Sequence, residues 1–159
     1  MLKDYIREVP DFPKKGINYK DIQPLLADDN AFFDALYDLG ELVDIEKVDY
    51  FVGIESRGFI FASALAAMNM KGFKMIRKAG KLPPANLVSI EYGLEYGRDT
   101  IEIEKGFGNV VIVDDVFATG GTMTAASLVA EMAGYQVVDE ICLIDIGITE
   151  RDMKCVISY

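Results

Sequence analysis

Two adjacent carboxylates, Asp114 and Asp115, follow a run of β-branched residues at positions 110–113. A small polar loop comes next, and a helical pattern begins at its end. The loop consists of Ala118, Thr119, Gly120, Gly121 and Thr122. Carboxylates accept hydrogen bonds from sugar hydroxyls and can share a hydrated Mg²⁺ with phosphate oxygens, while free N–H groups at a helix N-terminus bind phosphate. The spacing predicts a site for a phosphorylated sugar; the plainer alternative is a turn in which an Asp caps the helix.

A second set of polar residues has the chemistry to bind an anion. Its members are Ser56 and Arg57 in one turn and Arg77, Lys78 and Lys81 in another. The first turn follows an apolar segment, so Arg57 can face a ligand at the edge of a sheet; the alternative is a surface arginine paired with Glu55. The second turn concentrates three cations in five consecutive residues, although the chain as a whole is acidic. Composition alone does not separate an anion site there from a solvated turn.

The bulk composition limits the class of protein. The chain has 159 residues, of which 51% are hydrophobic, and a net charge of −10. This size predicts one domain with a substantial core. The negative charge argues against sequence-independent nucleic-acid binding, which depends on Lys and Arg. No apolar run approaches the roughly 20 residues of a membrane span, and no signal-peptide core is present, so we expect a soluble cytoplasmic protein.

Histidine is absent from the sequence. A Ser-His-Asp or Cys-His nucleophile and a histidine zinc site are therefore excluded. Any general base must be Asp, Glu, Lys, Tyr or the substrate itself. Cys142 and Cys155 form no CxxC pair, which favours buried thiols in a reducing compartment over a disulfide or a metal site.

The hydrophobic pattern predicts the elements that position these residues. Helices are expected over 2–8, after the Asp28-Asp29-Asn30 cap, from Arg57-Gly58 onward and over 121–133. The second helix would bury one face, formed by Phe32, Phe33, Leu36, Leu39, Leu42 and Val43. Extended segments are expected over 17–22, 50–54, 72–77, from 110, over 137–146 and over 154–158. Residues 87–91 and 100–103 flank a glycine-bearing turn and predict an antiparallel excursion. The alternation predicts an α/β fold with a doubly wound, mostly parallel sheet and ligands outside its C-terminal strand ends.

The segment around Asp114 resembles the phosphoribosyl-pyrophosphate motif of the type I phosphoribosyltransferases. Four more segments are similar, in the same order, to segments of adenine phosphoribosyltransferases. They are Asp11-Phe-Pro-x-x-Gly-Ile-x-Tyr-Lys-Asp-Ile22, Gly53-Ile-Glu-Ser-Arg-Gly-Phe59, Arg77-Lys-x-Gly-Lys-Leu-Pro83 and Leu94-Glu-Tyr-Gly97. The likeness runs from about Tyr5 to about Gly134. It implies a single domain over 1–159, with a small N-terminal hood of about residues 1–27 and a flexible catalytic loop of about residues 79–100.

The resemblance implies a reaction in purine salvage, in which adenine and phosphoribosyl pyrophosphate give AMP and pyrophosphate. Asp114 and Asp115 would bind the ribose hydroxyls, and residues 118–122 the 5′-phosphate. Ser56, Arg57, Arg77, Lys78 and Lys81 would hold the pyrophosphate. Mg²⁺ would bind through pyrophosphate and ribose. In similar enzymes part of the basic cluster reaches the neighbouring subunit, which implies a homodimer.

The same resemblance assigns catalytic residues. Glu95 and Tyr96 would belong to the mobile loop, which can close over the substrates and exclude water. Because the chain has no histidine, Glu95 is the natural carboxylate to manage a proton on the purine as N9 attacks. Asp115 is the third residue predicted to be catalytic. The alternative for Glu95 is an exposed acid in a β-turn.

The base pocket is expected at Asn18, Tyr19 and Lys20, with Arg57 and Val116 nearby. Similar enzymes recognise adenine through backbone groups here and pack an aromatic ring on its face. Many of them have arginine at the position of Lys20 and an apolar residue at that of Asn18, and arginine and lysine are not equivalent at such sites. These departures concern base specificity rather than phosphoribosyl binding.

Three alternative hypotheses remain. A 6-oxopurine enzyme of the mammalian type would carry an aspartate where this chain has Ala118, which favours adenine. A regulator that senses phosphoribosyl pyrophosphate would need a DNA-binding segment or a basic RNA-binding face, for which the chain lacks length and charge. An aspartyl-phosphate phosphatase would need its acids in a DxD spacing, which adjacent Asp114 and Asp115 do not provide.

Overall fold

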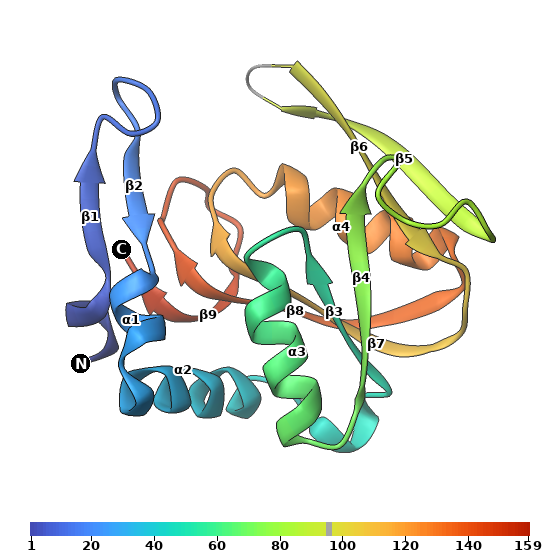
Figure 1. Cartoon of the computed structure of the whole chain (residues 1–159), viewed down its shortest axis with the longest axis horizontal. Helices are drawn as coiled ribbons and strands as arrows, with labels where there is room; N and C mark the ends of the chain where they lie inside the picture. The colour runs from blue at the N-terminus through green and yellow to red at the C-terminus, as the bar shows by residue number, and fades with distance from the viewer. Residues whose placement is uncertain (95–96) are drawn as a thin grey trace.

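The computed structural model describes residues 1–94 and 97–159. In this part of the chain a seven-stranded sheet forms the centre, in the order β5-β6-β4-β3-β7-β8-β9 (Figure 1). Its strands are β3 (Tyr50–Ile54), β4 (Gly72–Lys78), β5 (Leu87–Leu94), β6 (Gly97–Glu104), β7 (Gly108–Phe117), β8 (Tyr135–Asp145) and β9 (Lys154–Ser158). Strands β3, β4, β7, β8 and β9 are parallel to one another, whereas β5 and β6 form an antiparallel hairpin at one edge, and β6 also pairs antiparallel with β4. The predicted doubly wound, mostly parallel sheet with an antiparallel excursion is confirmed.

Helices cover both faces of the sheet. Helices α2 (Asp29–Glu41) and α3 (Gly58–Met68) pack on one face, and α4 (Gly121–Met132) packs on the other together with β5 and β6. Strand β7 serves both cores because its side chains alternate: Val111 and Val113 face α2 and α3, while Val110 and Ile112 face α4. This two-sided burial explains why the strand is an unbroken apolar run in the sequence.

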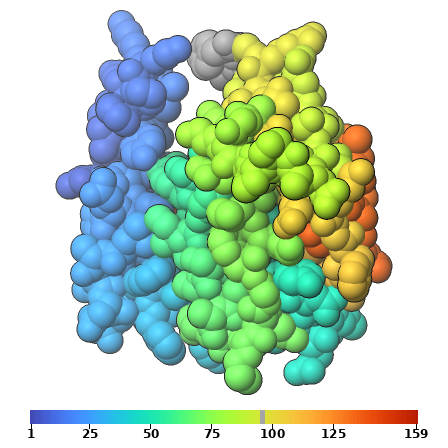
Figure 2. Space-filling model, turned by 45° about the vertical axis from the view of Figure 1, so that its right-hand side comes forward, coloured from blue at the N-terminus to red at the C-terminus, as the bar shows by residue number. Residues whose placement is uncertain are grey.

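The N-terminal segment forms a separate two-stranded sheet of β1 (Arg7–Pro10) and β2 (Asn18–Asp21), followed by the short helix α1 (Gln23–Ala27). The predicted helix over 2–8 was wrong: only Leu2–Tyr5 forms a 3-10 turn, and residues 7–10 pair with 18–21. A second 3-10 turn, Ile45–Lys47, precedes β3. Figure 1 places the β1–β2 hairpin and the β5–β6 hairpin on opposite sides of the upper strand ends, and Figure 2 shows the molecular surface hollowed between them.

Local packing explains two further features. Phe33 is 57% exposed, so its predicted place on the buried face of α2 was wrong; that face is formed by Ala31, Ala35, Leu36 and Leu39. The small residues of α3 do allow close packing on the sheet, since the Ala62 Cβ lies 3.0 Å from where a Gly53 Cβ would stand. None of the described helices is long and apolar enough to cross a membrane.

Candidate active site

The crevice for a ligand follows from the order of the strands. Helix α3 leads from β3 to β4 on one side, whereas α4 leads from β7 to β8 on the other. The loops after β3 and β7 therefore diverge at the same sheet edge, and such a topological switch point is where α/β sheets bind ligands. Because Gly53 pairs with Val113, residues 55–58 and residues 114–122 meet there.

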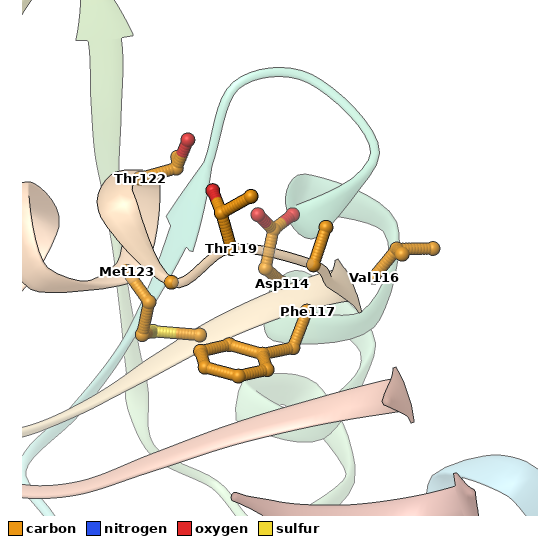
Figure 3. A pocket seen from close by; sticks show the side chains of 8 residues that line it. Asp114, Val116, Phe117, Thr119, Thr122 and Met123 are labelled. Carbon is orange, nitrogen blue, oxygen red and sulfur yellow. The ribbon is translucent and has the colours of Figure 1, made fainter. Parts of the chain in front are cut away.

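Residues 118–122, called the phosphate loop below, connect β7 to α4. Gly120 has a φ of +85°, which glycine adopts without strain, and it precedes α4 with no side-chain cap. The loop encloses a pocket of about 80 Å³. Figure 3 shows the oxygens of Asp114, Thr119 and Thr122 turned toward one side, with Phe117 and Met123 on the other. The polar side therefore offers hydroxyl groups and the positive end of a helix to an anion.

A larger pocket of about 400 Å³ adjoins the first one. The two share Asp114, Val116 and Thr122. Other residues lining the larger pocket include Glu55, Ser56, Arg57, Lys78 and Asp115. Residues that the sequence assigned to ribose, pyrophosphate and base thus line adjoining pockets, although they come from the turn after β3 and from β4, β7 and α4.

The paired carboxyls lie at the floor of this space. Asp115 is only 4% exposed, and Asp114 Oδ1 accepts a hydrogen bond from the Asp115 N–H at 2.9 Å. Burial raises the pKa of Asp114 well above its ordinary value, and the neighbouring Asp115 charge raises it further. Burial also raises the pKa of Asp115, against the opposing effect of the Arg57 guanidinium. Both acids are therefore held in an environment that disfavours their charge without a partner.

Arg57 connects the acids to the N-terminal hairpin. Its Nε lies 2.8 Å from Asp115 Oδ2, and its Nη1 donates to the Tyr19 hydroxyl at 2.7 Å. The alternative pairing of Arg57 with Glu55 does not occur. Asp115 Oδ2 is buried and is in this ion pair, but it accepts no hydrogen bond from the described residues. A buried carboxylate oxygen that accepts no hydrogen bond suits a ligand hydroxyl.

Glu55 gathers the basic cluster instead. It accepts hydrogen bonds from the Arg77 guanidinium at 3.3 and 3.4 Å and from the Lys78 N–H at 2.8 Å, and Lys81 Nζ lies 3.5 Å away. Although burial raises the pKa of Glu55, these donors lower it overall. The Lys78 ammonium pairs with Asp99 at 3.2 Å. Of the three cations, Lys78 lines the larger pocket, while Arg77 and Lys81 are held beside it by Glu55.

The predicted base-binding residues are divided between two environments. Asn18 and Lys20 line a pocket of about 620 Å³ between the hairpin and the phosphate loop, and both contact Glu8, at 2.6 and 2.9 Å. The Tyr19 ring lies against Arg57. Tyr159, which the sequence did not single out, lines the same pocket and has the Lys20 ammonium 3.6 Å from its ring centre. No local motif signals Tyr159, because only the folding of β9 beside the hairpin brings it there.

Glu95 and Tyr96 lie outside the described residues, so their catalytic assignment stays a prediction. For Mg²⁺, the described residues contain no group of three Cys, Asp or Glu placed to hold a metal ion. Asp114 and Asp115 are carboxylates at the crevice, which is the ligand type that Mg²⁺ prefers alongside substrate phosphates.

Comparison with known proteins agrees with this geometry. Residues 18–157 match the model of the phosphoribosyl transferase domain, and the chain belongs to this family. Within it, the chain is similar to adenine phosphoribosyltransferases. That of Hydrogenovibrio crunogenus is 52% identical over 147 residues, which cover 91% of this chain and 85% of the relative.

Solved structures of adenine phosphoribosyltransferases have the same fold. The crystal structure from Thermoanaerobacter pseudethanolicus gives a TM-score of 0.90 at 40% identity, covering 99% of this chain and 98% of that one. The enzyme from Saccharomyces cerevisiae, complexed with an imino-altritol bisphosphate and adenine, gives 0.87 at 32% identity, covering 97% and 94%. The fold predicted from the sequence is therefore that of the type I phosphoribosyltransferases.

Proposed function

We propose that this protein transfers the phosphoribosyl group of phosphoribosyl pyrophosphate to adenine, giving AMP and pyrophosphate in purine salvage. The observation that supports it most directly is the joining of two pockets around Asp114: one is walled by the phosphate loop, the other by Arg57, Lys78 and Asp115. A phosphorylated ribose with an anionic leaving group matches this distribution of charge. The choice of adenine as the base rests on the relatives named adenine phosphoribosyltransferase.

The chain's own groups would act as follows. The carboxylates of Asp114 and Asp115 accept hydrogen bonds from the ribose 2′- and 3′-hydroxyls, and Asp115 Oδ2, which is ion-paired with Arg57 but accepts no hydrogen bond from the described residues, fits this role. The phosphate loop holds the 5′-phosphate. Ser56, Arg57 and the basic cluster of Arg77, Lys78 and Lys81 attract pyrophosphate, and cations that grip a leaving group stabilise the transition state more than the ground state.

In the bond-making step, the N9 lone pair forms a bond to C1′ while the C1′–O electron pair departs with pyrophosphate. The N9 proton passes to the Glu95 carboxylate. Tyr96, in the same loop, would help to cover the reacting groups. Asn18, Tyr19 and Lys20 would surround the base, with Val116 of β7 facing it.

Mg²⁺ is part of the proposal. Asp114 and Asp115 line the larger pocket and would be its protein ligands, and the remaining ligands would come from substrate oxygens. When bound, the ion would neutralise pyrophosphate charge. We further propose a cytoplasmic homodimer, in which part of the basic cluster serves the neighbouring site. Light scattering coupled to size exclusion tests the dimer, and a monomer at catalytic concentrations would contradict it.

A panel of bases tests the function. Purified protein is given Mg²⁺ and phosphoribosyl pyrophosphate with adenine, hypoxanthine, guanine or xanthine, and pyrophosphate release and nucleotide formation are followed. We expect efficient AMP formation and little product from the 6-oxopurines. Preference for a 6-oxopurine would overturn the base assignment but keep the reaction class. Tight phosphoribosyl-pyrophosphate binding without turnover of any base would favour a sensor.

A further inference from the structure

The segment between β8 and β9, residues 146–153, reaches the far side of the phosphate loop. Its first residue is fixed to the end of β7, since the Ile146 N–H donates to the Phe117 carbonyl at 3.1 Å. Its cation, Arg151, lies with the guanidinium carbon 5.6 Å from the centre of the Phe117 ring. Arg151 Nη1 is also 3.7 Å from the point where a Cβ on Gly120 would stand. A positive charge therefore lies beside the residue that opens α4.

The orientation of this guanidinium is fixed by contacts with two elements. Arg151 Nη1 donates to the Thr124 hydroxyl in α4 at 2.9 Å, and Nη2 forms an ion pair with Glu140 of β8. Glu140 in turn accepts a hydrogen bond from the Ser127 hydroxyl of α4. Arg151 thus connects the first two turns of α4 to the sheet. It does so from outside the pocket of the phosphate loop, where Phe117 forms part of the wall.

The position of the charge favours a role toward a ligand. A cation near the N-terminus of a helix opposes the helix dipole, and an anion bound there removes the conflict. Helix α4 has no acidic residue in its first turn. Glu140 offsets part of the Arg151 charge, yet the side chain of Arg151 is 38% exposed and its fork is shared with Thr124. An anion in the phosphate loop would complete the compensation.

We propose that Arg151 is a positioning residue for the 5′-phosphate: it fixes Phe117 and the start of α4, and its charge favours an anion in the phosphate loop. This inference rests on the proposed function, because it assumes that the loop receives the 5′-phosphate. It assigns no contact between Arg151 and the base. The effect is therefore expected in the affinity for the phosphorylated sugar and not in the KM for adenine.

The test compares Arg151→Gln with Lys154→Gln. The control is matched, because Lys154 pairs with Asp139, the neighbour of Glu140 in β8, and the two acids are similarly exposed, at 21% and 20%. Calorimetry measures the Kd of ribose 5-phosphate, and steady-state kinetics measure the KM for phosphoribosyl pyrophosphate and for adenine. For Arg151→Gln we expect the Kd of ribose 5-phosphate and the KM for phosphoribosyl pyrophosphate to rise about tenfold, which is the scale of one charge at a part-buried helix terminus. The KM for adenine should stay within about twofold of the wild-type value. Lys154→Gln should leave all three unchanged.

Two more variants make the test independent of the folding of Arg151→Gln. Thr124→Val removes one hydrogen bond of Arg151 at an exposed position and should raise the same Kd by a smaller factor. Arg151→Lys keeps the charge but not the planar fork, so its Kd should fall between those of Arg151→Gln and the wild type.

The outcomes separate this inference from the proposed function. A wild type that binds ribose 5-phosphate and turns over adenine, with Arg151→Gln equal to it, would overturn the inference alone. A parallel rise in the KM for adenine would mean general loosening and would also overturn it. Failure of the wild type to bind ribose 5-phosphate would refute the assignment of the loop and this inference together.

Discussion

Gly58→Ala tests how closely the start of α3 approaches the end of β7. A Cβ at this position would stand 2.6 Å from the Val113 carbonyl oxygen and 3.1 Å from Asp114 Oδ1. Ordinary contact begins at 3.4 Å, so the two backbones must separate by about 0.8 Å, and overpacking of this kind costs about 1–3 kcal/mol. For a domain of this size, each kcal/mol lowers Tm by about 2–4 °C. The displaced end of β7 carries Asp114, which is assigned to the ribose. Because a misplacement near 1 Å can lower a rate about 100-fold, we expect kcat/KM to fall about 100-fold.

Gly40→Ala is the matched control. It also adds one methyl group to a helix, but a Cβ on Gly40 of α2 would meet only Leu65 Cδ2, at 3.9 Å. Ala in place of Gly in a helix stabilises by about 0.5–1 kcal/mol, so Tm should rise and kcat/KM should stay. Thermal unfolding and initial-rate assays of AMP formation measure both variants. If Gly58→Ala matches Gly40→Ala in Tm and keeps the wild-type kcat/KM, the close approach does not position the acids.

The other predictions concern the acids, the loop and the thiols. Changing both Asp114 and Asp115 to Asn should weaken phosphoribosyl-pyrophosphate binding, and unaltered affinity by calorimetry would contradict the ribose assignment. Burial raises the pKa of Asp114, so the folded protein resists ionisation of this carboxyl, whereas the unfolded chain ionises it near pH 4. The free energy of unfolding of the wild type therefore falls as pH rises from about 4. The Tm of Asp114→Asn should exceed that of the wild type by more at pH 7 than at pH 4, and an equal difference at both pH values would refute this. Glu95→Gln should lower kcat about 100-fold or more, and an unchanged kcat would remove Glu95 from the mechanism. Burial raises the pKa of the Cys142 thiol, so a thiol reagent should modify Cys155 in the native protein and Cys142 only after denaturation, equal rates being the contrary result.

Local sequence was sufficient to predict the strand, the phosphate loop and the helix of the central motif. A run of β-branched residues predicts a buried strand, and the positive φ of Gly120 needs glycine. Partners from distant segments could not be predicted in the same way. Arg57 has Glu55 as a near neighbour in sequence, yet it pairs with Asp115, because β3 and β7 are adjacent in the sheet.

The N-terminal segment shows how tertiary pairing overrides a local pattern. The sequence predicted a helix over 2–8, and the four-residue spacing of Leu2 and Ile6 is compatible with one face of such a helix. In the structure, residues 7–10 gain cross-strand hydrogen bonds with 18–21, and Ile6 is buried in the core as an extended residue. Since β-structure depends on its partner strand more than on intrinsic preference, this outcome required knowledge of the hairpin. The same holds for Tyr159, whose place beside Lys20 depends on β9.

Helices α2 and α4 begin in opposite ways, because α2 is a packing element and α4 opens onto the crevice. Helix α2 caps itself: the Asp28 side chain accepts from the Ala31 N–H, and Asp29 lies in its first turn. Helix α4 begins after Gly120 with no side-chain cap and no acid in its first turn. Its N-terminal N–H groups therefore stay available to an anion. Burial of the charged acids of β7 and the uncapped N–H groups of α4 both cost free energy, and the two features lie together in the crevice. A single ligand with a phosphate and two hydroxyls would compensate both.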